Sequence, residues 1–524
     1  MWHAIGIVTT AAACGLASRV VAPWYLLFWI FLVPWLLALD RTVTMRGALA
    51  SGLAMAAVFS AIVFRWFPVA MADYAQAPLW LVSTIGLLVT PVFQPQLVVF
   101  PLVRQAARQR GLSATMVAIA GAAAYVGAEW AFGKVLGDTI GLGLHPSRAV
   151  RQLADVAGPP GLTLALVLGN ECVRASVAAV VARAGMRRIA MPLAILALMV
   201  TLLAGYGRIR LAELETRASE PPITVGIVQA NIAHYDRLKA EIGTYEAVRH
   251  ILDAHFEVSR SIFDSNAIDL LVWPETVYPT TFGTPKSEDG AAFDRAIGGL
   301  VVATGRPLVF GSYDAEGGRE YNAAVFLEPD GQGGVTFDTY RKATLFPLTE
   351  RVPAWVDGPR LRAWLPWLGS WHPGTGAAVM DLRLPGGRRI RTAPLICYDA
   401  VYPWNAARAV LGGAELLVTL SNDSWLADGD GARLHFLVSI FRSIETRRPQ
   451  VRATTTGISA VVTPAGDVVA SAGVHERTGL VAAVNPIRST LPLATRLGDW
   501  LGPVAIGLVM LLLARPARRV ATDP

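Results

Sequence analysis

The sequence is poor in charged residues. Only 16% of its 524 residues are Asp, Glu, Lys or Arg, whereas 53% are hydrophobic. Soluble globular chains carry about 25% charged residues. The shortage is concentrated in the first two hundred residues and the last thirty, while residues 208–485 have the composition of a soluble domain. This distribution excludes a wholly soluble protein and divides the chain into a membrane part, a globular part and a membrane end.

Cysteine and histidine are scarce as well. The chain has three cysteines, Cys14, Cys172 and Cys397, and eight histidines. An odd and scattered set of cysteines argues against a disulfide framework. No His, Cys and carboxylate residues follow one another at the spacing of a metal site. We therefore expect no disulfide, no metal and no cofactor.

Basic runs with interleaved aromatic residues are also missing. The formal net charge is +7, but much of the excess is arginine in short loops between apolar segments, as in membrane proteins that orient themselves by charge. Nucleic-acid-binding proteins need basic residues clustered on one face or element. We expect a lipid bilayer as partner and no nucleic acid.

Apolar segments of membrane-spanning length are abundant. A bilayer core requires about 20 apolar residues in a helix. Candidate spans lie at residues 4–20, 23–39, 46–64, 78–102, 114–132, 160–182, 189–206 and 497–514. We predict a multi-pass α-helical membrane domain of about seven helices over 1–207 and a C-terminal membrane helix over 497–514.

Arginines between the spans predict the orientation of this domain. They fall on alternate connections, at Arg41 and Arg46, at Arg104, Arg108 and Arg110, at Arg183, Arg187 and Arg188, and at Arg515, Arg518 and Arg519. The positive-inside rule places their side in the cytoplasm. The globular part and the loops at 65–77 and 133–159 then lie on the outer side.

Two charged residues lie inside the sixth span. Glu171 and Arg174 are three residues apart, so they share a helix face and can pair. Charges within a membrane often mark a functional site. A pair near the cytoplasmic end of a span can equally extend toward the headgroups, and both interpretations stay open.

The globular part consists of short β-rich runs separated by helical stretches. The runs begin at Ile223, Ile268, Pro307, Asn322, Ile390, Glu415 and Val451. Helical spacing occurs at 240–264 and 432–447. Strands that alternate with helices predict a layered α/β domain. The TPAGDVV segment has a Pro-x-Gly-Asp turn and predicts a hairpin.

Three segments place a reactive side chain just after an apolar strand. Glu275 lies in VWPETVYP, Lys342 in YRKATLFPLTERVP and Cys397 in APLICYDAVYP. If these strand ends meet, the groups suit acyl transfer through a thioester. Glu would take the thiol proton, the thiolate would attack a carbonyl, and Lys would stabilise the oxyanion. A lone buried Cys is more often a small hydrophobe, and sequence spacing does not show convergence.

These segments, in this order, resemble the Glu–Lys–Cys signature of the nitrilase superfamily. With seven spans before the globular part and one after it, the chain resembles the apolipoprotein N-acyltransferase branch. Further matching stretches are VGIVQANI, Tyr321–Asn322, SNDSW at Ser421–Trp425, His435–Phe436, Arg442 with Glu445, and Arg452 with Gly457. The match covers nearly all of residues 222–485, where we expect a nitrilase-like catalytic domain.

The resemblance implies an αββα sandwich and a two-stage reaction. Cys397 would take an acyl chain from a phospholipid donor and pass it to the N-terminal cysteine amine of a lipoprotein acceptor. Glu275 is the implied general base and Lys342 the electrostatic stabiliser. The implied supporting residues are Glu350, Tyr398 through its backbone N–H, Tyr321, Asn322, Asn422 and Trp425. The resemblance also implies a monomer in the bacterial inner membrane, with the catalytic domain on the periplasmic side.

The sequence departs from the family pattern close to the triad. The usual Glu two residues after the Cys is Asp399, and the usual Asn-Asn before Gly457 is Thr455-Thr456. Two alternatives stay open. One is a membrane-anchored nitrilase-type amidase in which water accepts the acyl group. The other is a relative encoded with conjugal-transfer genes that has a different acceptor or no catalysis.

Overall fold

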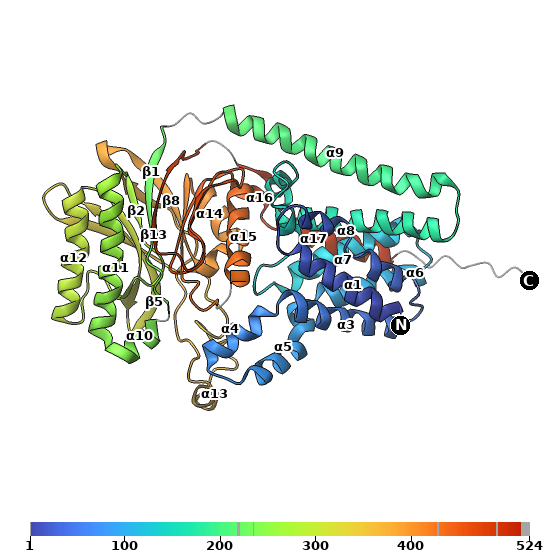
Figure 1. Ribbon diagram of the computed structural model, residues 1–524, viewed down its shortest axis with the longest axis horizontal. Helices are drawn as coiled ribbons and strands as arrows, with labels where there is room; N and C mark the ends of the chain where they lie inside the picture. Colours follow the sequence, from blue (N-terminus) through green and yellow to red (C-terminus); the bar gives the residue numbers. More distant parts are fainter. Residues whose placement is uncertain (1, 217–220, 234, 427–428, 489–490, 515–524) are drawn as a thin grey trace, which may run out of the picture. The chain divides into compact units, whose positions relative to one another are not determined.

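A computed structural model of the chain forms two compact units (Figure 1). It describes residues 2–216, 221–233, 235–426, 429–488 and 491–514. Of these residues, the helical unit comprises 2–72, 76–213 and 497–514, and the α/β unit comprises 73–75 and those between 214 and 496. The arginines expected at 515, 518 and 519 lie outside the described residues.

The helical unit is built from apolar helices of unequal length. Its elements are α1 (Trp2–Ala17), η1 (Trp24–Trp29), α2 (Val33–Leu39), α3 (Met45–Val63), α4 (Trp66–Ala75), α5 (Leu79–Phe93), α6 (Gln96–Gln109), α7 (Ala114–Phe132), η2 (Ile140–Leu144), η3 (Val150–Leu153), α8 (Ala154–Val181), α9 (Met186–Thr216) and α17 (Leu501–Ala514). Among the described residues, four helices are long and apolar enough to cross a membrane, or five if α5 and α6 count as one span. The expected membrane-helix character is confirmed, but the spans predicted at 4–20, 23–39 and 497–514 correspond to shorter apolar helices.

Two of the predicted spans are interrupted at prolines. The segment expected as one helix over 78–102 bends by 45° between α5 and α6. Pro95 follows Gln94 at this bend, and the residue before a proline is disfavoured in the helical conformation. The segment 23–39 divides into η1 and α2, which begins with Pro34 in its first turn. Proline suits this position because the first turn leaves its N–H groups unpaired anyway.

The two connections predicted on the outer side contain helices. Residues 65–77 include α4, and residues 133–159 include η2, η3 and the beginning of α8. Helices α4, η2 and η3 are each shorter than a membrane span, so the length of an apolar run does not predict them. Both connections are therefore partly helical.

The intramembrane pair predicted at Glu171 and Arg174 is present and belongs to a larger ion network. Arg174 Nε lies 2.6 Å from Glu171 Oε2, and Arg174 Nη1 lies 2.8 Å from Asp40 Oδ2. Arg104 donates two hydrogen bonds to Glu171, at 2.7 and 3.2 Å. Glu171 and Arg104 are each 3% exposed. Because the contacts join α6, α8 and the end of α2 in a buried place, they favour a helix-linking role over a pair that extends to the surface.

The α/β unit contains two mixed sheets. The first has the order β13-β1-β2-β4-β5-β6, with β3 paired to β4, and the second has the order β12-β11-β10-β9-β8-β7. Its strands are β1 (Ile223–Gln229), β2 (Leu270–Val272), β3 (Tyr278–Thr281), β4 (Leu308–Glu316), β5 (Arg319–Pro329), β6 (Val335–Arg341), β7 (Met380–Arg383), β8 (Arg389–Ile396), β9 (Leu416–Ser421), β10 (Gln450–Thr454), β11 (Ala460–Val462), β12 (Val468–Ser471) and β13 (Thr478–Val484). Its helices are α10 (Tyr235–Ile242), α11 (Thr244–Ser265), α12 (Glu288–Thr304), α13 (Pro359–Trp364), η4 (Pro385–Gly387), η5 (Cys397–Ala400), α14 (Pro403–Leu411), α15 (Gly429–Thr446) and α16 (Leu493–Leu497).

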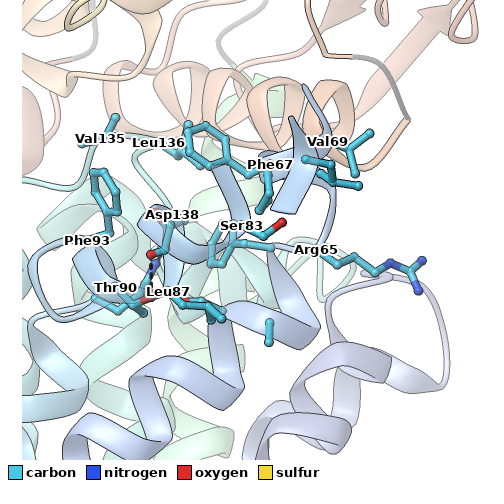
Figure 2. A pocket seen from close by; sticks show the side chains of 17 residues that line it. Arg65, Phe67, Val69, Ser83, Leu87, Thr90, Phe93, Val135, Leu136 and Asp138 are labelled. Carbon is cyan, nitrogen blue, oxygen red and sulfur yellow. Dashed lines mark hydrogen bonds between the residues drawn. The ribbon is translucent and has the colours of Figure 1, made fainter. Parts of the chain in front are cut away.

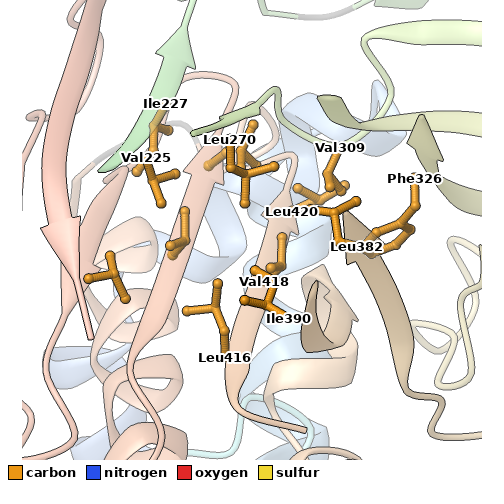
Figure 3. Packing of buried hydrophobic residues seen from close by; sticks show 14 of the residues in the cluster. Val225, Ile227, Leu270, Val309, Phe326, Leu382, Ile390, Leu416, Val418 and Leu420 are labelled. Carbon is orange, nitrogen blue, oxygen red and sulfur yellow. The ribbon is translucent and has the colours of Figure 1, made fainter. Parts of the chain in front are cut away.

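The sheets pack face to face between two helical layers, which confirms the predicted αββα sandwich. Ile227 and Leu270 of the first sheet and Leu416 and Val418 of the second belong to one buried core (Figure 3). Helices α11 and α12 cover the other face of the first sheet, and α14 and α15 cover that of the second (Figure 1). This burial on both faces explains why the central strands have continuous apolar runs in place of alternation.

Several elements were not anticipated from the sequence. They are β3, β6, β7, β13, α12 and α14, whereas the predicted hairpin is present as the antiparallel pair of β11 and β12. Strands β6, β7 and β13 lie at sheet edges. An edge strand is stabilised by its one neighbour and exposes polar side chains, so its sequence pattern is weak.

Candidate active site

Four strands of the sandwich end around one buried cluster of polar side chains. Glu275 follows β2 by three residues, and Lys342, Cys397 and Asn422 directly follow β6, β8 and β9. Glu275 and Lys342 share a hydrogen bond, and both interact electrostatically with Cys397. The structure thus brings together the three residues that sequence analysis proposed as a triad.

The Glu275 carboxylate is held by three donors. Its Oε1 accepts hydrogen bonds from Asn322 Nδ2 at 2.7 Å and from Lys342 Nζ at 3.2 Å. Its Oε2 accepts one from the backbone N–H of Asn422 at 2.6 Å. Glu275 is only 3% exposed. A buried carboxylate with this many donors has a defined orientation, which a general base requires.

Gly311 on β4 makes room for the backbone of Glu275. A Cβ atom on Gly311 would lie 2.5 Å from Glu275 Cα and 2.4 Å from the Thr276 nitrogen. The Gly311 N–H also donates to the Pro274 carbonyl at 2.9 Å. Any larger residue at this position would displace the carboxylate from the cluster.

Lys342 lies between two carboxylates. Its Nζ is 2.7 Å from Glu350 Oε1 and 3.2 Å from Glu275 Oε1, and the side chain is 1% exposed. Burial disfavours the charged ammonium, but the charges of Glu275 and Glu350 outweigh burial and hold the pKa of Lys342 well above its usual value. Lys342 is therefore an ammonium, suited to stabilising negative charge and unsuited to acting as a base.

Cys397 begins η5 with a left-handed backbone conformation, φ +46°. Burial raises the pKa of its thiol, the charge of Glu275 raises it further, and Lys342 lowers it. The net pKa lies above that of an ordinary cysteine. The resting residue is consequently a neutral thiol, which becomes a nucleophile only when a base takes its proton.

Alkylation by iodoacetamide should report this raised pKa. We expect the rate on the peptide that carries Cys397 to increase by about tenfold per pH unit between pH 7 and 9, because the thiolate fraction rises in that proportion below the pKa. For a free cysteine peptide, with a pKa of about 8.5, the rate should rise only about threefold between pH 8 and 9. A rate at Cys397 that is already constant at neutral pH would contradict the assignment of a neutral thiol.

The supporting residues occupy different places. Asn322 lies in the cluster, whereas the neighbouring Tyr321 lies on the other face of β5, with its ring 4.2 Å from the Arg341 guanidinium. Trp425 contacts Phe346, which in turn contacts the ring of Tyr398. Trp425 and Tyr398 thus belong to one cluster of aromatic rings. Asn422 and Glu350 instead bind charged groups directly: Asn422 binds Glu275, and Glu350 binds Lys342.

Asp399, where the family pattern has Glu, is fully buried beside the triad. It accepts hydrogen bonds from Tyr340 Oη at 2.9 Å and from the backbone N–H groups of Thr344 and Ile396 at 2.7 and 3.0 Å. Burial raises its pKa to about 6 despite the nearby Lys342. Asp399 thus connects the loop after Lys342 to the strand that precedes Cys397. The shorter side chain accepts all three of these hydrogen bonds.

A second polar cluster, which sequence analysis did not assign to the site, lies next to Cys397. His435 Nε2 is 3.2 Å from the carbonyl oxygen of Cys397, and His435 Nδ1 is 2.9 Å from Asp423 Oδ1. Asp423 Oδ2 is 3.0 Å from Arg452 Nη2. All three residues belong to the stretches that carry the family resemblance, so a signal was present in the sequence without a role attached to it.

The described residues contain no side-chain grouping typical of a metal site. Within the described part of the chain, no group of three or more His, Cys, Asp or Glu side chains could hold a metal ion. In the active-site cluster itself, an ammonium occupies the position between the two carboxylates.

The helical unit has a cavity of its own, of about 310 Å³ (Figure 2). It is bounded by residues of α3, α4, α5 and the segment before η2. Most lining side chains are apolar, such as Leu87, Phe93 and Leu136, while Asp138 and Gln94 contribute polar groups. A cavity of this kind matches an amphiphilic molecule better than a water-soluble one.

Family models match both parts of the chain. A model described as "Carbon-nitrogen hydrolase" matches residues 224–490, and one described as "Apolipoprotein N-acyltransferase N-terminal domain" matches residues 11–172. An apolipoprotein N-acyltransferase of Bdellovibrio bacteriovorus is 28% identical over 476 residues, covering 87% of this chain and 83% of the relative. One of Caulobacter vibrioides is 30% identical over 385 residues, covering 70% and 67%. The structure of an amidase from Nesterenkonia sp. AN1 is 22% identical in sequence. Its alignment covers 53% of this chain and 93% of the amidase chain, with a TM-score of 0.37.

Proposed function

This chain belongs to the apolipoprotein N-acyltransferase family of carbon–nitrogen hydrolases, and from that premise we propose that it transfers an acyl chain from a phospholipid to the N-terminal amine of a lipoprotein. The observation that carries the proposal is the buried cluster of Glu275, Lys342 and Glu350 beside the Cys397 thiol. A base, a fixed cation and a nucleophile are the groups that acyl transfer through a thioester requires.

The first stage forms the acyl-enzyme. Glu275 takes the proton of the Cys397 thiol, and the sulfur attacks the ester carbonyl of the phospholipid. The negative charge that develops on the carbonyl oxygen is stabilised by Lys342 Nζ and by the backbone N–H of Tyr398. The bond to the ester oxygen then breaks, Glu275 returns the proton to that oxygen, and a lysophospholipid leaves a thioester on Cys397.

The second stage transfers the acyl group to nitrogen. The lipoprotein amine attacks the thioester carbonyl while Glu275 accepts an amine proton. The C–S bond breaks, the proton moves to the Cys397 sulfur, and an amide is released. A thioester already stores the activation that amide formation needs, so these residues complete the cycle without a cofactor.

Both proposed substrates, the phospholipid and the lipoprotein, reside in a lipid bilayer, where the apolar helices would place the enzyme. We place the protein in the bacterial inner membrane as a monomer, with the α/β unit on the periplasmic side. The arginine groups on alternate connections support this orientation. The apolar cavity with Asp138 and Gln94 at its wall supports binding of an amphiphile by the helical unit.

Mass spectrometry of lipoprotein N-termini tests the proposal. We expect depletion of this protein in its own bacterium to leave lipoproteins without the N-linked acyl chain, and re-expression of the intact gene to restore it. Unchanged N-acylation would contradict the proposal. Hydrolysis of simple amides with release of ammonia by the purified full-length chain, together with unchanged lipoproteins, would instead identify the amidase alternative, in which water is the acceptor.

A further inference from the structure

The carbonyl group of the nucleophile is held by a histidine from another helix. His435 on α15 lies with its Nε2 3.2 Å from the Cys397 carbonyl oxygen. A carbonyl oxygen can only accept a hydrogen bond, so Nε2 carries a proton and donates it to this bond. The side chain is only 12% exposed. This contact joins the side chain of an α15 residue directly to the backbone of the nucleophile.

Asp423 and Arg452 fix the orientation of this histidine. Asp423 Oδ1 lies 2.9 Å from His435 Nδ1, and Asp423 Oδ2 lies 3.0 Å from Arg452 Nη2. Asp423 and Arg452 are 1% and 0% exposed. Burial disfavours the charge of Asp423, but Arg452 and His435 outweigh burial and hold its pKa well below the usual range. An ionised carboxylate therefore holds the ring by one oxygen and is itself held by the other.

Gly457 supplies the space for this arrangement. A Cβ atom at Gly457 would lie 2.2 Å from Asp423 Oδ2. An alanine here would force the carboxylate away from Arg452 and His435. One connected cluster is thus formed by four residues that lie apart in the sequence, namely Asp423, His435, Arg452 and Gly457.

The held carbonyl belongs to the same peptide unit as the Tyr398 N–H. The bond between Cys397 and Tyr398 is an ordinary trans peptide, so its C=O and N–H point in opposite directions within one plane. A donor that fixes the carbonyl consequently fixes the direction of the N–H. A hydrogen bond to the carbonyl also polarises the peptide and strengthens the N–H as a donor.

We infer that His435 is a positioning residue that orients and polarises the Cys397–Tyr398 peptide so that the Tyr398 N–H stabilises the oxyanion during acyl transfer. Asp423 and Arg452 hold His435 in the required orientation. The same contact also helps to keep Cys397 in its left-handed conformation, φ +46°, which a residue with a side chain adopts only when its surroundings enforce it. This inference rests on the proposed function, since it assumes that an acyl carbonyl reacts at Cys397.

Two reactions of the same thiol separate this role from a merely structural one. Thioester formation develops an oxyanion, whereas alkylation by iodoacetamide displaces iodide and develops none. Both can be followed by mass spectrometry on the peptide that carries Cys397, with the full-length chain in detergent micelles containing bacterial phosphatidylethanolamine and phosphatidylglycerol. We expect His435→Leu to slow thioester formation by about 100-fold or more, as for loss of an oxyanion donor, and to leave alkylation close to the wild-type rate.

Two further variants and a control sharpen the test. A glutamine amide can place an N–H near the position of His435 Nε2, so His435→Gln should recover part of the lost rate. Gly457→Ala should slow thioester formation in the same way as His435→Leu, because it displaces Asp423. His250→Ala changes an exposed histidine on α11 and should behave as wild type.

The outcomes distinguish the inference from the proposed function. Wild-type thioester formation in His435→Leu would overturn the inference alone, and so would an equal loss of thioester formation and alkylation, which indicates a structural role. A wild-type chain that is alkylated at Cys397 but never acylated by phospholipid would overturn the proposed function, and this inference with it.

Discussion

A Cys397→Ala variant is expected to form no acyl-enzyme and to fail to rescue a conditional lipoprotein-acylation mutant that the wild-type gene rescues. In the proposed reaction the Cys397 sulfur is the protein atom that bonds to the acyl group, and alanine has no group that can form this bond. Mass spectrometry of the purified full-length chain after incubation with phospholipid should show the acyl mass on the wild-type Cys397 peptide and on no peptide of the variant.

Cysteine 172 offers the matched control for this experiment. Cys172→Ala changes a partly buried thiol in α8, outside the catalytic cluster, and should form the acyl-enzyme at the wild-type rate. Rescue of growth by both Cys397→Ala and Cys172→Ala would mean that the thiol is irrelevant and that the thioester mechanism is wrong.

Replacing Lys342 with methionine is expected to impair both stability and catalysis. The variant removes the ammonium that lies between Glu275, which is buried, and Glu350, which is partly buried, and leaves both carboxylates without their cation. Loss of one partner of a buried ion pair costs about 3–5 kcal/mol. Loss of an oxyanion-stabilising group lowers the rate by about 10²–10³-fold. Thermal unfolding in detergent and the rate of thioester formation measure the two effects.

Two comparisons separate these effects of Lys342. Lys286 forms an exposed ion pair with Glu320, with both side chains more than 60% exposed, so Lys286→Met should change the free energy of unfolding by less than about 1 kcal/mol. In a Lys342→Met, Glu350→Gln double variant, stability should partly recover because one buried charge is removed, whereas thioester formation should not. Full catalytic activity of the double variant would contradict the electrostatic role of Lys342.

The sequence by itself determined the apolar helices, the central strands and the family resemblance, and it predicted the candidate reactive groups. Apolar runs such as those of β2 and β9 carry their own pattern, because strands buried on both faces need mostly apolar side chains. Helices α11 and α15 carry a helical period for the same local reason. The positions of Glu275, Lys342 and Cys397 just after strands then indicated one reactive edge.

Only the tertiary structure decided how these groups interact. Lys342 binds a carboxylate 67 residues away, and His435 binds a carbonyl 38 residues away; such contacts depend on how strands and helices pack and leave no periodic trace in the sequence. The same holds for the bend between α5 and α6, for the edge strands, and for the raised pKa of the Cys397 thiol, which depends on burial and on charges from other strands. A local sequence pattern shows which side chains of a segment are buried. The hydrogen bonds and ion pairs between segments depend instead on how those segments pack together.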